Sequence, residues 1–126
     1  MKLFNLTGKV AVITGGNGGI GLGMARGLAE AGAKIAVAAR NQAKAKAAMA
    51  ELKKLGGEAS FFAADVAKEA DCRAMIAAVA KQFGRLDILV NCSGMSIRKR
   101  PETYTVAEWH QVMEVNLTGT FVCAQA

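Results

Sequence analysis

The stretch from Val10 to Ala31, VAVITGGNGGIGLGMARGLAEA, constrains the fold more than any other part of this sequence. Residues 10–14 form a short run rich in β-branched side chains without a polar break, which is typical of a parallel strand buried on both faces. From position 20 onward apolar residues recur at helical spacing, and Gly32 then supplies a C-terminal stop. These apolar residues are Ile20, Met24, Leu28 and Ala31.

The glycines between this strand and this helix indicate a phosphate-binding turn. A pyrophosphate needs backbone N–H groups within hydrogen-bonding distance, and a Cβ on the turn would hold the phosphates away from them. A helix that begins near Gly19 adds a partial charge of roughly +0.5 at its N-terminus. A glycine-rich turn alone is weak evidence, but its position between a buried strand and a helix favours dinucleotide binding.

Two glycine registers fit this turn. The common spacing GxGxxG is met at Gly16, Gly18 and Gly21. The spacing TGxxxGxG is met from Thr14 to Gly21. We favour the second register, because Gly15 directly follows the strand and Ile20, between two glycines, is expected to anchor the helix.

Length and composition predict one globular domain. The 126 residues are 52% hydrophobic and 21% charged, as in an ordinary chain with one core, so we expect a single domain over residues 1–126. No apolar stretch approaches the ~18 residues of a membrane-spanning helix. The N-terminal residues MKLFNLTGKV lack the apolar core of a secretion signal. These features predict a cytoplasmic location and no membrane partner.

Cysteine spacing and charge distribution argue against other function classes. Cys72, Cys92 and Cys123 are widely separated and form no CxxC pair, which predicts reduced core thiols rather than disulfides or a metal site. The net charge of +6 comes largely from lysines interleaved with alanine, without a series of stacking aromatic residues. This pattern indicates a solvated basic surface and no nucleic-acid partner.

Three further strands follow the first unit, each with a helix after it. Apolar runs predict strands over residues 34–39, 58–64 and 86–92. The last helix is expected to begin at a capping box of Thr105 and Glu108. Its expected inner face comprises Trp109, Val112, Met113, Asn116, Leu117, Thr120 and Ala124. Four strands that alternate with four helices predict an α/β fold, a doubly wound parallel sheet of the Rossmann-like kind.

Right-handed crossovers bring the carboxyl ends of parallel strands to one edge of the sheet. The glycine turn, Arg40, Asp65 and Asn91 each follow or end a predicted strand, so we expect them to share that edge. Open α/β sheets bind their ligands there.

The motifs at this edge, in this order, resemble those of the short-chain dehydrogenase/reductase family along essentially the whole chain. Residues 14–21 match the family's TGxxxGxG, Asp65-Val66 its adenine-contacting Asp-Val, and residues 91–94 its Asn-Asn-Ala-Gly. Asn116 matches the asparagine of the family's catalytic tetrad. Cys92 and Ser93 depart from the family pattern, but this turn mainly offers backbone groups, so we expect a small effect.

The resemblance implies roles for individual residues. Asn116 is expected to be catalytic by holding a water of the proton relay, with a purely structural amide as the alternative. The alternative to an adenine contact for Asp65 is a structural role as the residue that leads into a helix. The alternative for Asn91 is that it only ends a strand. No metal site is expected. The residues expected to bind the cofactor are Thr14, Gly15, Asn17, Gly18, Gly19, Ile20, Gly21, Arg40, Asn41, Asp65, Val66, Asn91, Ser93 and Gly94.

The family's catalytic Ser and its Tyr-x-x-x-Lys have no match in this sequence. Tyr104 is the only tyrosine, and Glu108 rather than a lysine stands four positions after it. The resemblance therefore implies the cofactor-binding N-terminal half of a family member, inactive on its own. We expect Trp109 to lie in the core and His110 on the surface.

By resemblance, the complete protein is a nicotinamide-dependent alcohol dehydrogenase or carbonyl reductase that acts on a small alcohol or carbonyl substrate. Arg40 predicts that NADP(H) is preferred, with NAD(H) as the alternative, because a guanidinium attracts the 2′-phosphate that a carboxylate would repel. A dinucleotide-binding module without catalytic activity is the alternative function.

A basic cluster and two apolar surfaces predict further partners. Arg98 and Arg100, in the loop after the fourth strand, are expected to attract an anionic substrate such as a sugar acid, with a solvated loop as the alternative. The unpaired fourth strand and the apolar face of the last helix are expected to drive association. The family resemblance implies a homo-dimer or homo-tetramer for the complete protein.

Overall fold

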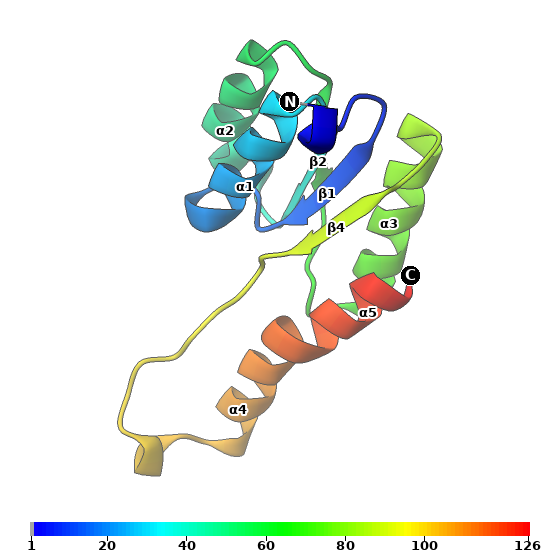
Figure 1. Ribbon diagram of the computed structural model, residues 1–126. Coiled ribbons are helices and arrows are strands. Elements are labelled where there is room, and N and C mark those ends of the chain that lie inside the picture. Colours follow the sequence, from blue (N-terminus) through cyan, green and yellow to red (C-terminus); the bar gives the residue numbers. More distant parts are fainter. Residues whose placement is uncertain (1) are drawn as a thin grey trace.

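A computed structural model describes residues 2–126 and contains one parallel sheet (Figure 1). The strands lie in the order β3-β2-β1-β4, and every neighbouring pair is parallel. Their bounds are β1 Val10–Thr14, β2 Lys34–Ala39, β3 Ala59–Ala63 and β4 Ile88–Asn91. The predicted four-stranded parallel sheet is therefore confirmed, and its third and fourth strands are shorter than expected.

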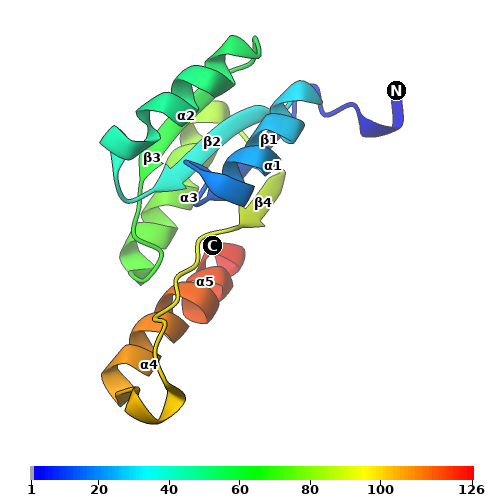
Figure 2. The same ribbon diagram turned by 90° about the vertical axis from the view of Figure 1, so that its left-hand side faces the viewer.

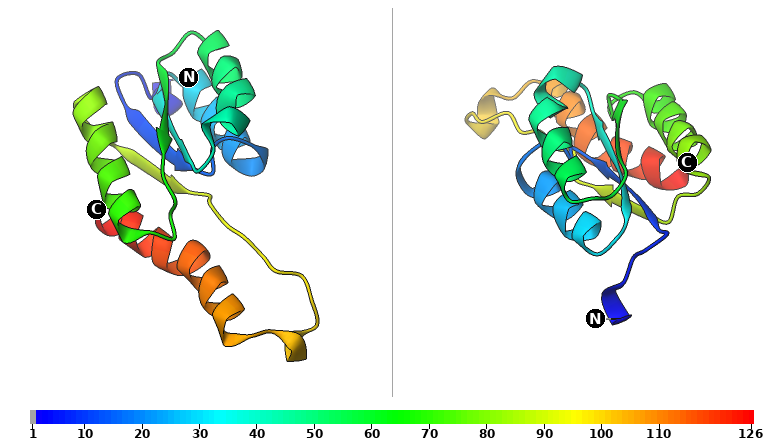
Figure 3. Two further views of the ribbon diagram at one scale, coloured as in Figure 1. Left: turned by 180° about the vertical axis from the view of Figure 1, so that it is seen from behind. Right: turned by 90° about the horizontal axis from the view of Figure 1, so that it is seen from above.

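Helices cover both faces of the sheet. α1 and α2 pack on one face, and α3 and α5 pack on the other (Figures 2 and 3). Short 3₁₀ turns occur at Lys2–Phe4 and Pro101–Thr103. The helices are α1 Gly19–Glu30, α2 Gln42–Lys54, α3 Glu69–Phe83, α4 Val106–Met113 and α5 Gly119–Gln125, with a π-helical turn over Glu114–Thr118. The predicted fourth helix is thus one continuous helical run in which the π turn separates α4 from α5.

β1 is the centre of the core. All five of its residues are buried, because the strand has a neighbour on each side and helices above and below. Its side chains alternate between the two faces: Val10 and Val12 face α3 and α5, whereas Ala11 and Ile13 face α1 and α2. Each buried Val or Ile contributes about 1.5–3 kcal/mol relative to an exposed one. The continuous apolar run of this strand therefore fits its burial on both faces.

The apolar stripe predicted for the first helix is confirmed at Leu28, which packs against the core, and wrong at Ile20 and Met24. Ile20 is 73% exposed and does not anchor the helix, and Met24 is 46% exposed. The buried residues of α1 are instead Gly21, Ala25 and Ala29. These side chains are small, so the helix axis lies close to the sheet, and Leu22 and Leu28 are half-buried against the core.

The inner face predicted for the last helix is also wrong in part, because Trp109, Asn116, Leu117 and Ala124 are exposed and only Val112, Met113 and Thr120 are half-buried. Trp109 is 60% exposed and Leu117 is 58% exposed, so Trp109 is not a core residue. The reason is the position of the helix: α4 lies beyond the end of the sheet, together with the loop that precedes it (Figure 1). Burial begins only in α5, where Val122 and Cys123 contact the core. The capping box of Thr105 and Glu108 is confirmed.

The cysteines are free thiols, as expected. Cys72 of α3 and Cys123 of α5 are buried, and Cys92 is half-buried. Burial raises the pKa of the Cys123 thiol to about 12 and also raises that of Cys72. These two thiols therefore stay protonated and act as small apolar side chains that pack α5 against α3.

Asp87 fixes the start of β4 against the start of β1. Its Oδ2 accepts a hydrogen bond from the backbone N–H of Val10 at 2.9 Å, and the same oxygen accepts one from Nε of Arg85 at 2.8 Å. Lys9 approaches Oδ1 at 3.5 Å. The hydrogen bonds from Arg85 and from Val10 hold the pKa of Asp87 at about 2, below its ordinary value.

We expect Asp87→Asn to lower the Tm at pH 7, because the amide loses the charge interactions with Arg85 and Lys9. A folded-state pKa below the unfolded value gives a stabilisation that is complete above the unfolded pKa. The difference in Tm between wild type and variant is therefore constant above about pH 5 and shrinks as the pH falls toward 2. Thermal melts from pH 7 to pH 2, with the exposed Glu30→Gln as control, test this. A difference that persists unchanged at pH 2 would contradict it.

Candidate functional site

A cleft of about 360 Å³ lies at the carboxyl edge of the sheet. Four of the segments that border it each lie at or just after the end of one of the four strands, and Val115 of the π-helical turn adds a fifth. Of the predicted residues, it brings together Gly15, Asn17, Arg40, Asn41, Asp65, Val66, Ser93 and Gly94. Thr14, Gly18, Gly19, Ile20, Gly21, Asn91 and Asn116 do not line the cleft itself. The lining residues that sequence reasoning missed include Ala39, Lys44, Met95 and Val115.

The glycine turn has the geometry that the TGxxxGxG register requires. Gly15 has φ +68°, a left-handed conformation that side chains rarely adopt, and it directly follows β1. A Cβ on Gly21 would collide with the carbonyl oxygen of Gly15, so the first turn of α1 can approach the strand end only without a side chain. Gly18 and Gly19 meet nothing within 4 Å and leave open space in front of the turn. The turn therefore presents its backbone to a ligand.

The Thr14 hydroxyl joins the ends of β1 and β4. Thr14 is 1% exposed, and its Oγ1 accepts hydrogen bonds from the backbone N–H groups of Cys92 at 3.1 Å and Ser93 at 3.2 Å. The hydroxyl also lies 3.5 Å from the carbonyl of Val90, to which it donates. Thr14 thus holds the Cys92–Ser93 turn beside the glycine turn from below the cleft.

Two cations lie where β2 ends and α2 begins. The Asn41 side chain caps α2 by accepting a hydrogen bond from the backbone N–H of Lys44 at 3.1 Å. Arg40 and Lys44 are both exposed and both line the cleft. Two cations and the N-terminus of a helix all attract negative charge, so this arrangement is suited to an anion. Lys44 stands three residues after the N-cap, which is the signal that would have identified it.

The turn after β3 is fixed by Asp65. One oxygen of its carboxylate accepts a hydrogen bond from the N–H of Ala67 at 3.0 Å, and its own N–H donates to Asp71 at 2.9 Å. Val66 lies beside it, and the buried Gly119 of α5 packs against the backbone of Val66. This contact brings the C-terminal helical run up to the cleft, where Val115 forms part of the wall.

Asn116 lies in the π-helical turn and binds the loop after β4. Its Oδ1 accepts from the N–H of Met95 at 2.8 Å, and its Nδ2 donates to the carbonyl of Met95 at 2.9 Å. Both polar ends of the amide are therefore used by one residue of the cleft wall. π turns recur at functional sites, because the extra residue re-aims the neighbouring side chains.

The loop that carries Arg98 and Arg100 is held by the lysine between them. Lys99 forms an ion pair with Glu108 at 2.5 Å, and its ammonium lies 5.3 Å from the centre of the Tyr104 ring. The hydrogen bond from Lys99 lowers the pKa of Glu108. Arg98 and Arg100 are exposed, and neither lines the cleft. Within residues 2–126 neither guanidinium makes an ion pair.

Two other kinds of site are absent from the part of the chain that the structure describes. No three His, Cys, Asp or Glu side chains gather closely enough there to hold a metal ion. None of its helices is both long enough and apolar enough to cross a membrane.

Comparison with known proteins identifies the family. The profile described as short chain dehydrogenase matches residues 9–126. The chain therefore belongs to the short-chain dehydrogenase/reductase family, as the order of its motifs predicted.

Individual relatives differ in what they are named for. The rhamnolipids biosynthesis 3-oxoacyl-(acyl-carrier-protein) reductase of Pseudomonas aeruginosa is 41% identical over 122 residues, which cover 97% of this chain and 47% of that protein. The D-threitol dehydrogenase of Mycolicibacterium smegmatis is 42% identical over 123 residues, which cover 98% of this chain and 47% of that protein. The chain thus spans about half the length of the curated relatives it matches.

A solved structure with a bound cofactor has the same fold. The Pseudomonas aeruginosa RhlG/NADP active-site complex superposes with a TM-score of 0.89 at 38% identity, over 97% of this chain and 47% of that chain. A relative with this fold therefore carries NADP.

The central role of the Thr14 hydroxyl can be tested by an isosteric substitution. Thr14→Val leaves the N–H groups of Cys92 and Ser93 without an acceptor, and each unsatisfied group costs about 1–3 kcal/mol. We expect the free energy of unfolding in denaturant titrations to fall by at least this amount. Thr14→Ser keeps the acceptor and is expected to lose less. Equal stability of wild type and Thr14→Val would show that the hydroxyl does not hold the two strand ends.

Proposed function

We propose that the protein is an NADP(H)-dependent oxidoreductase that interconverts an alcohol and a ketone or aldehyde on a small substrate. The single observation that carries this proposal is the cleft at the carboxyl edge, where a turn of exposed backbone faces two cations at a helix N-terminus. The first suits a pyrophosphate and the second suits the 2′-phosphate of NADP(H). The NADP complex of a relative supports the same choice of cofactor.

Each part of the cleft has a proposed task in binding the cofactor. The bound nicotinamide would supply the hydride chemistry, and the protein would supply binding and orientation. The backbone N–H groups between Gly15 and Gly19 would donate to the pyrophosphate, and Arg40 with Lys44 would hold the 2′-phosphate. Asp65 and Val66 would border the adenine, and the Ser93-Gly94 backbone would form the floor under the nicotinamide half.

The proposed role of Asn116 in the proton relay stays a prediction. Its amide binds the backbone of Met95 on both sides, which supports the alternative of a structural amide that positions the cleft wall. A role in catalysis requires that its backbone carbonyl, or a rearranged side chain, hold the relay water. The family's catalytic Ser and Tyr-x-x-x-Lys have no match within these 126 residues. We therefore expect the 126-residue chain to bind the cofactor without turnover.

A non-catalytic dinucleotide-binding module is the second candidate function, because the cleft at the carboxyl edge accounts for cofactor binding and not for turnover. Cofactor binding and turnover must therefore be measured separately. NADPH binding with turnover by the full-length protein supports the enzyme. Binding without turnover over a broad panel of alcohols and carbonyl compounds supports the module.

Cofactor choice tests the two cations. A hydrogen bond to a charged group contributes about 1.5–3 kcal/mol, so Arg40→Ala and Lys44→Ala should each weaken NADPH binding about ten- to a hundredfold. NADH lacks the 2′-phosphate, so its affinity should change little. Calorimetric titration of both cofactors measures this, and Lys54→Ala, at the far end of α2, is the matched control. NADH binding as tight as that of NADPH in the wild type would contradict the proposal.

We propose an anionic substrate, with sugar acids as the leading class. The relatives are named for substrates as different as D-threitol and a 3-oxoacyl carrier protein, so the substrate of this chain must be inferred from its own residues. Arg98 and Arg100 are free of ion pairs within residues 2–126, while Lys99 fixes the loop through Glu108. A guanidinium that no carboxylate occupies is available for a substrate carboxylate.

The substrate class can be tested in the full-length enzyme. We expect Arg98→Ala/Arg100→Ala to lower kcat/KM for acidic substrates about tenfold or more, since a charge-assisted hydrogen bond is lost, and to leave neutral substrates of similar size unchanged. Lys81→Ala, on the exposed side of α3, is the control. An equal loss for both substrate classes, or no loss, would leave the two arginines without a substrate role.

We also propose that the protein forms a homo-dimer or homo-tetramer through α4 and α5. Val106, Trp109, Leu117 and Phe121 are all more than half exposed, and large exposed apolar patches mark interaction surfaces. We expect Trp109→Ser/Phe121→Ser to shift sedimentation velocity profiles toward the monomer, with Leu3→Ser, another exposed apolar position, as control. A wild-type protein that is monomeric at all concentrations would refute this assembly.

A further inference from the structure

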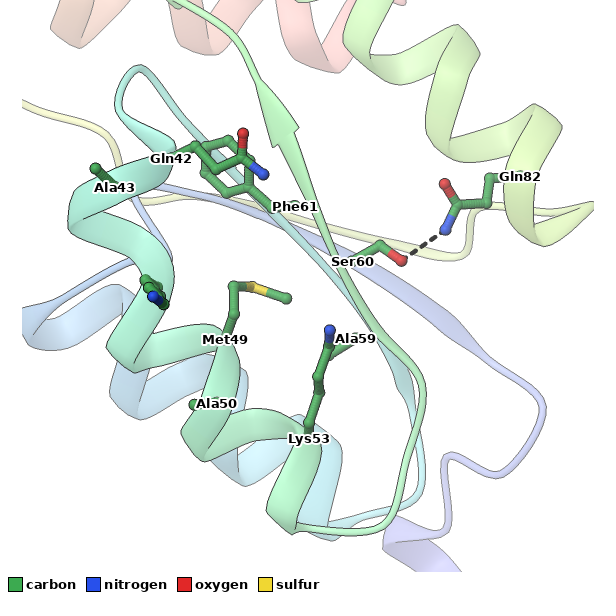
Figure 4. A pocket seen from close by; sticks show the side chains of 10 residues that line it. Gln42, Ala43, Met49, Ala50, Lys53, Ala59, Ser60, Phe61 and Gln82 are labelled. Atoms are coloured by element: carbon green, nitrogen blue, oxygen red, sulfur yellow. Dashed lines mark hydrogen bonds between the residues drawn. The ribbon is translucent and has the colours of Figure 1, made fainter.

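A second hollow, of about 830 Å³, lies outside the cofactor cleft between α2 and β3 (Figure 4). The residues that matter for its chemistry are Lys46, Met49, Lys53, Ala59, Phe61 and Gln82. None of its lining residues also lines the cofactor cleft. The two sites are therefore separate, and we call this one the β3 groove.

The floor of the β3 groove is a free strand edge. β3 is the last strand of the sheet and pairs only with β2. The carbonyl of Glu58 and the N–H of Ala64 form hydrogen bonds with β2. In a parallel ladder every second residue bonds to the same neighbouring strand, so the backbone groups of Ser60 and Phe62 also bond to β2. The N–H and C=O groups of Ala59, Phe61 and Ala63 therefore point away from the sheet. Such a row of unpaired groups is a template for one more strand.

One wall of the β3 groove is apolar. Met49 of α2 extends toward β3, and Phe61 lies below the start of the same helix (Figure 4). On the opposite side, Gln82 of α3 donates a hydrogen bond to Ser60 at 2.6 Å, which joins α3 to β3 (Figure 4). An extended segment on this edge would thus have an apolar surface under alternate side chains.

The rim of the β3 groove is positively charged. Lys46 and Lys53 both line it, two helical turns apart on the same side of α2, and no Asp or Glu lines it. Within residues 2–126 neither ammonium makes an ion pair. The nearby carboxylates of Glu51 and Glu58 are already paired, with Arg26 and Lys34 respectively.

We propose that the β3 groove binds an extended acidic segment of a partner protein, which adds to the sheet as a fifth strand beside β3. Backbone groups of Ala59, Phe61 and Ala63 pair with the segment, and Lys46 and Lys53 select acidic side chains. Acidic residues four positions apart fit this spacing, because two helical turns measure about 11 Å and four strand residues about 13 Å. A second copy of this chain would bring the same lysines against each other, so charge complementarity favours a different partner.

The test uses the full-length protein and a labelled, end-capped peptide Thr-Glu-Thr-Val-Thr-Glu-Thr. Fluorescence anisotropy should show saturable binding, and Lys46→Glu/Lys53→Glu should weaken it about tenfold or more, as expected for two exposed ion pairs turned into repulsions. Lys54→Glu/Lys81→Glu, which reverses two exposed lysines outside the groove, is the matched control for net charge. A peptide with Lys in place of Glu should bind more tightly to Lys46→Glu/Lys53→Glu, the reversed variant, than to the wild type.

Three results would overturn the proposal. Equal binding of the Glu and Lys peptides would show that Lys46 and Lys53 do not select acidic side chains. Undiminished binding of a peptide N-methylated at alternate amides would show that no strand is added. A peptide displaced by NADP⁺ would sit in the cofactor cleft instead. A failure of NADP(H) to bind, by contrast, would refute the proposed function and leave the β3 groove unaffected. Sedimentation of the wild type and the reversed variant separates self-association through β3 from peptide binding.

Discussion

The hydrogen bonds at the Thr14 hydroxyl are the interaction on which the candidate site depends. This one buried oxygen binds the N–H groups that follow β4 and stands directly before the glycine turn that follows β1. The two central strands therefore end at the same level. Because Gly15 then turns left-handed without a side chain, the backbone of both segments faces one cleft. The ligand-binding edge is thus built mainly from main-chain groups whose position the strand ladder fixes.

Positive charge enters this site only at its exposed rim. The floor is made by Gly15, Ser93 and Gly94, while Arg40 and Lys44 lie at the surface where α2 begins. Backbone donors and a helix N-terminus recognise a phosphate without the cost of burying a charged side chain. Under the proposed function, the exposed cations would then select between ligands that differ by one phosphate.

The sequence predicted the parts of the structure that depend on strand ends. Arg40 and Asp65 were placed correctly because any residue that follows a parallel strand reaches the carboxyl edge, whatever its exact packing. Ile20 and Trp109 were misplaced, because helical periodicity shows that one face is apolar but not how closely the helix approaches the sheet or whether it extends past it. Lys44 could have been found from its place three residues after the N-cap Asn41, whereas the β3 groove was missed because it depends on how α2 packs against the edge of β3.

The most direct test of the central claim is amide-resolved NMR of the protein titrated with NADP⁺. We expect chemical shifts to change first at the backbone amides of Gly15, Asn17, Gly18 and Gly19, and at residues 40, 41, 44, 65, 66 and 93–95. The β3 groove and the amino-terminal edge of the sheet should change little. Shift changes centred on the β3 groove, or none at saturating NADP⁺, would contradict a dinucleotide site at the carboxyl edge.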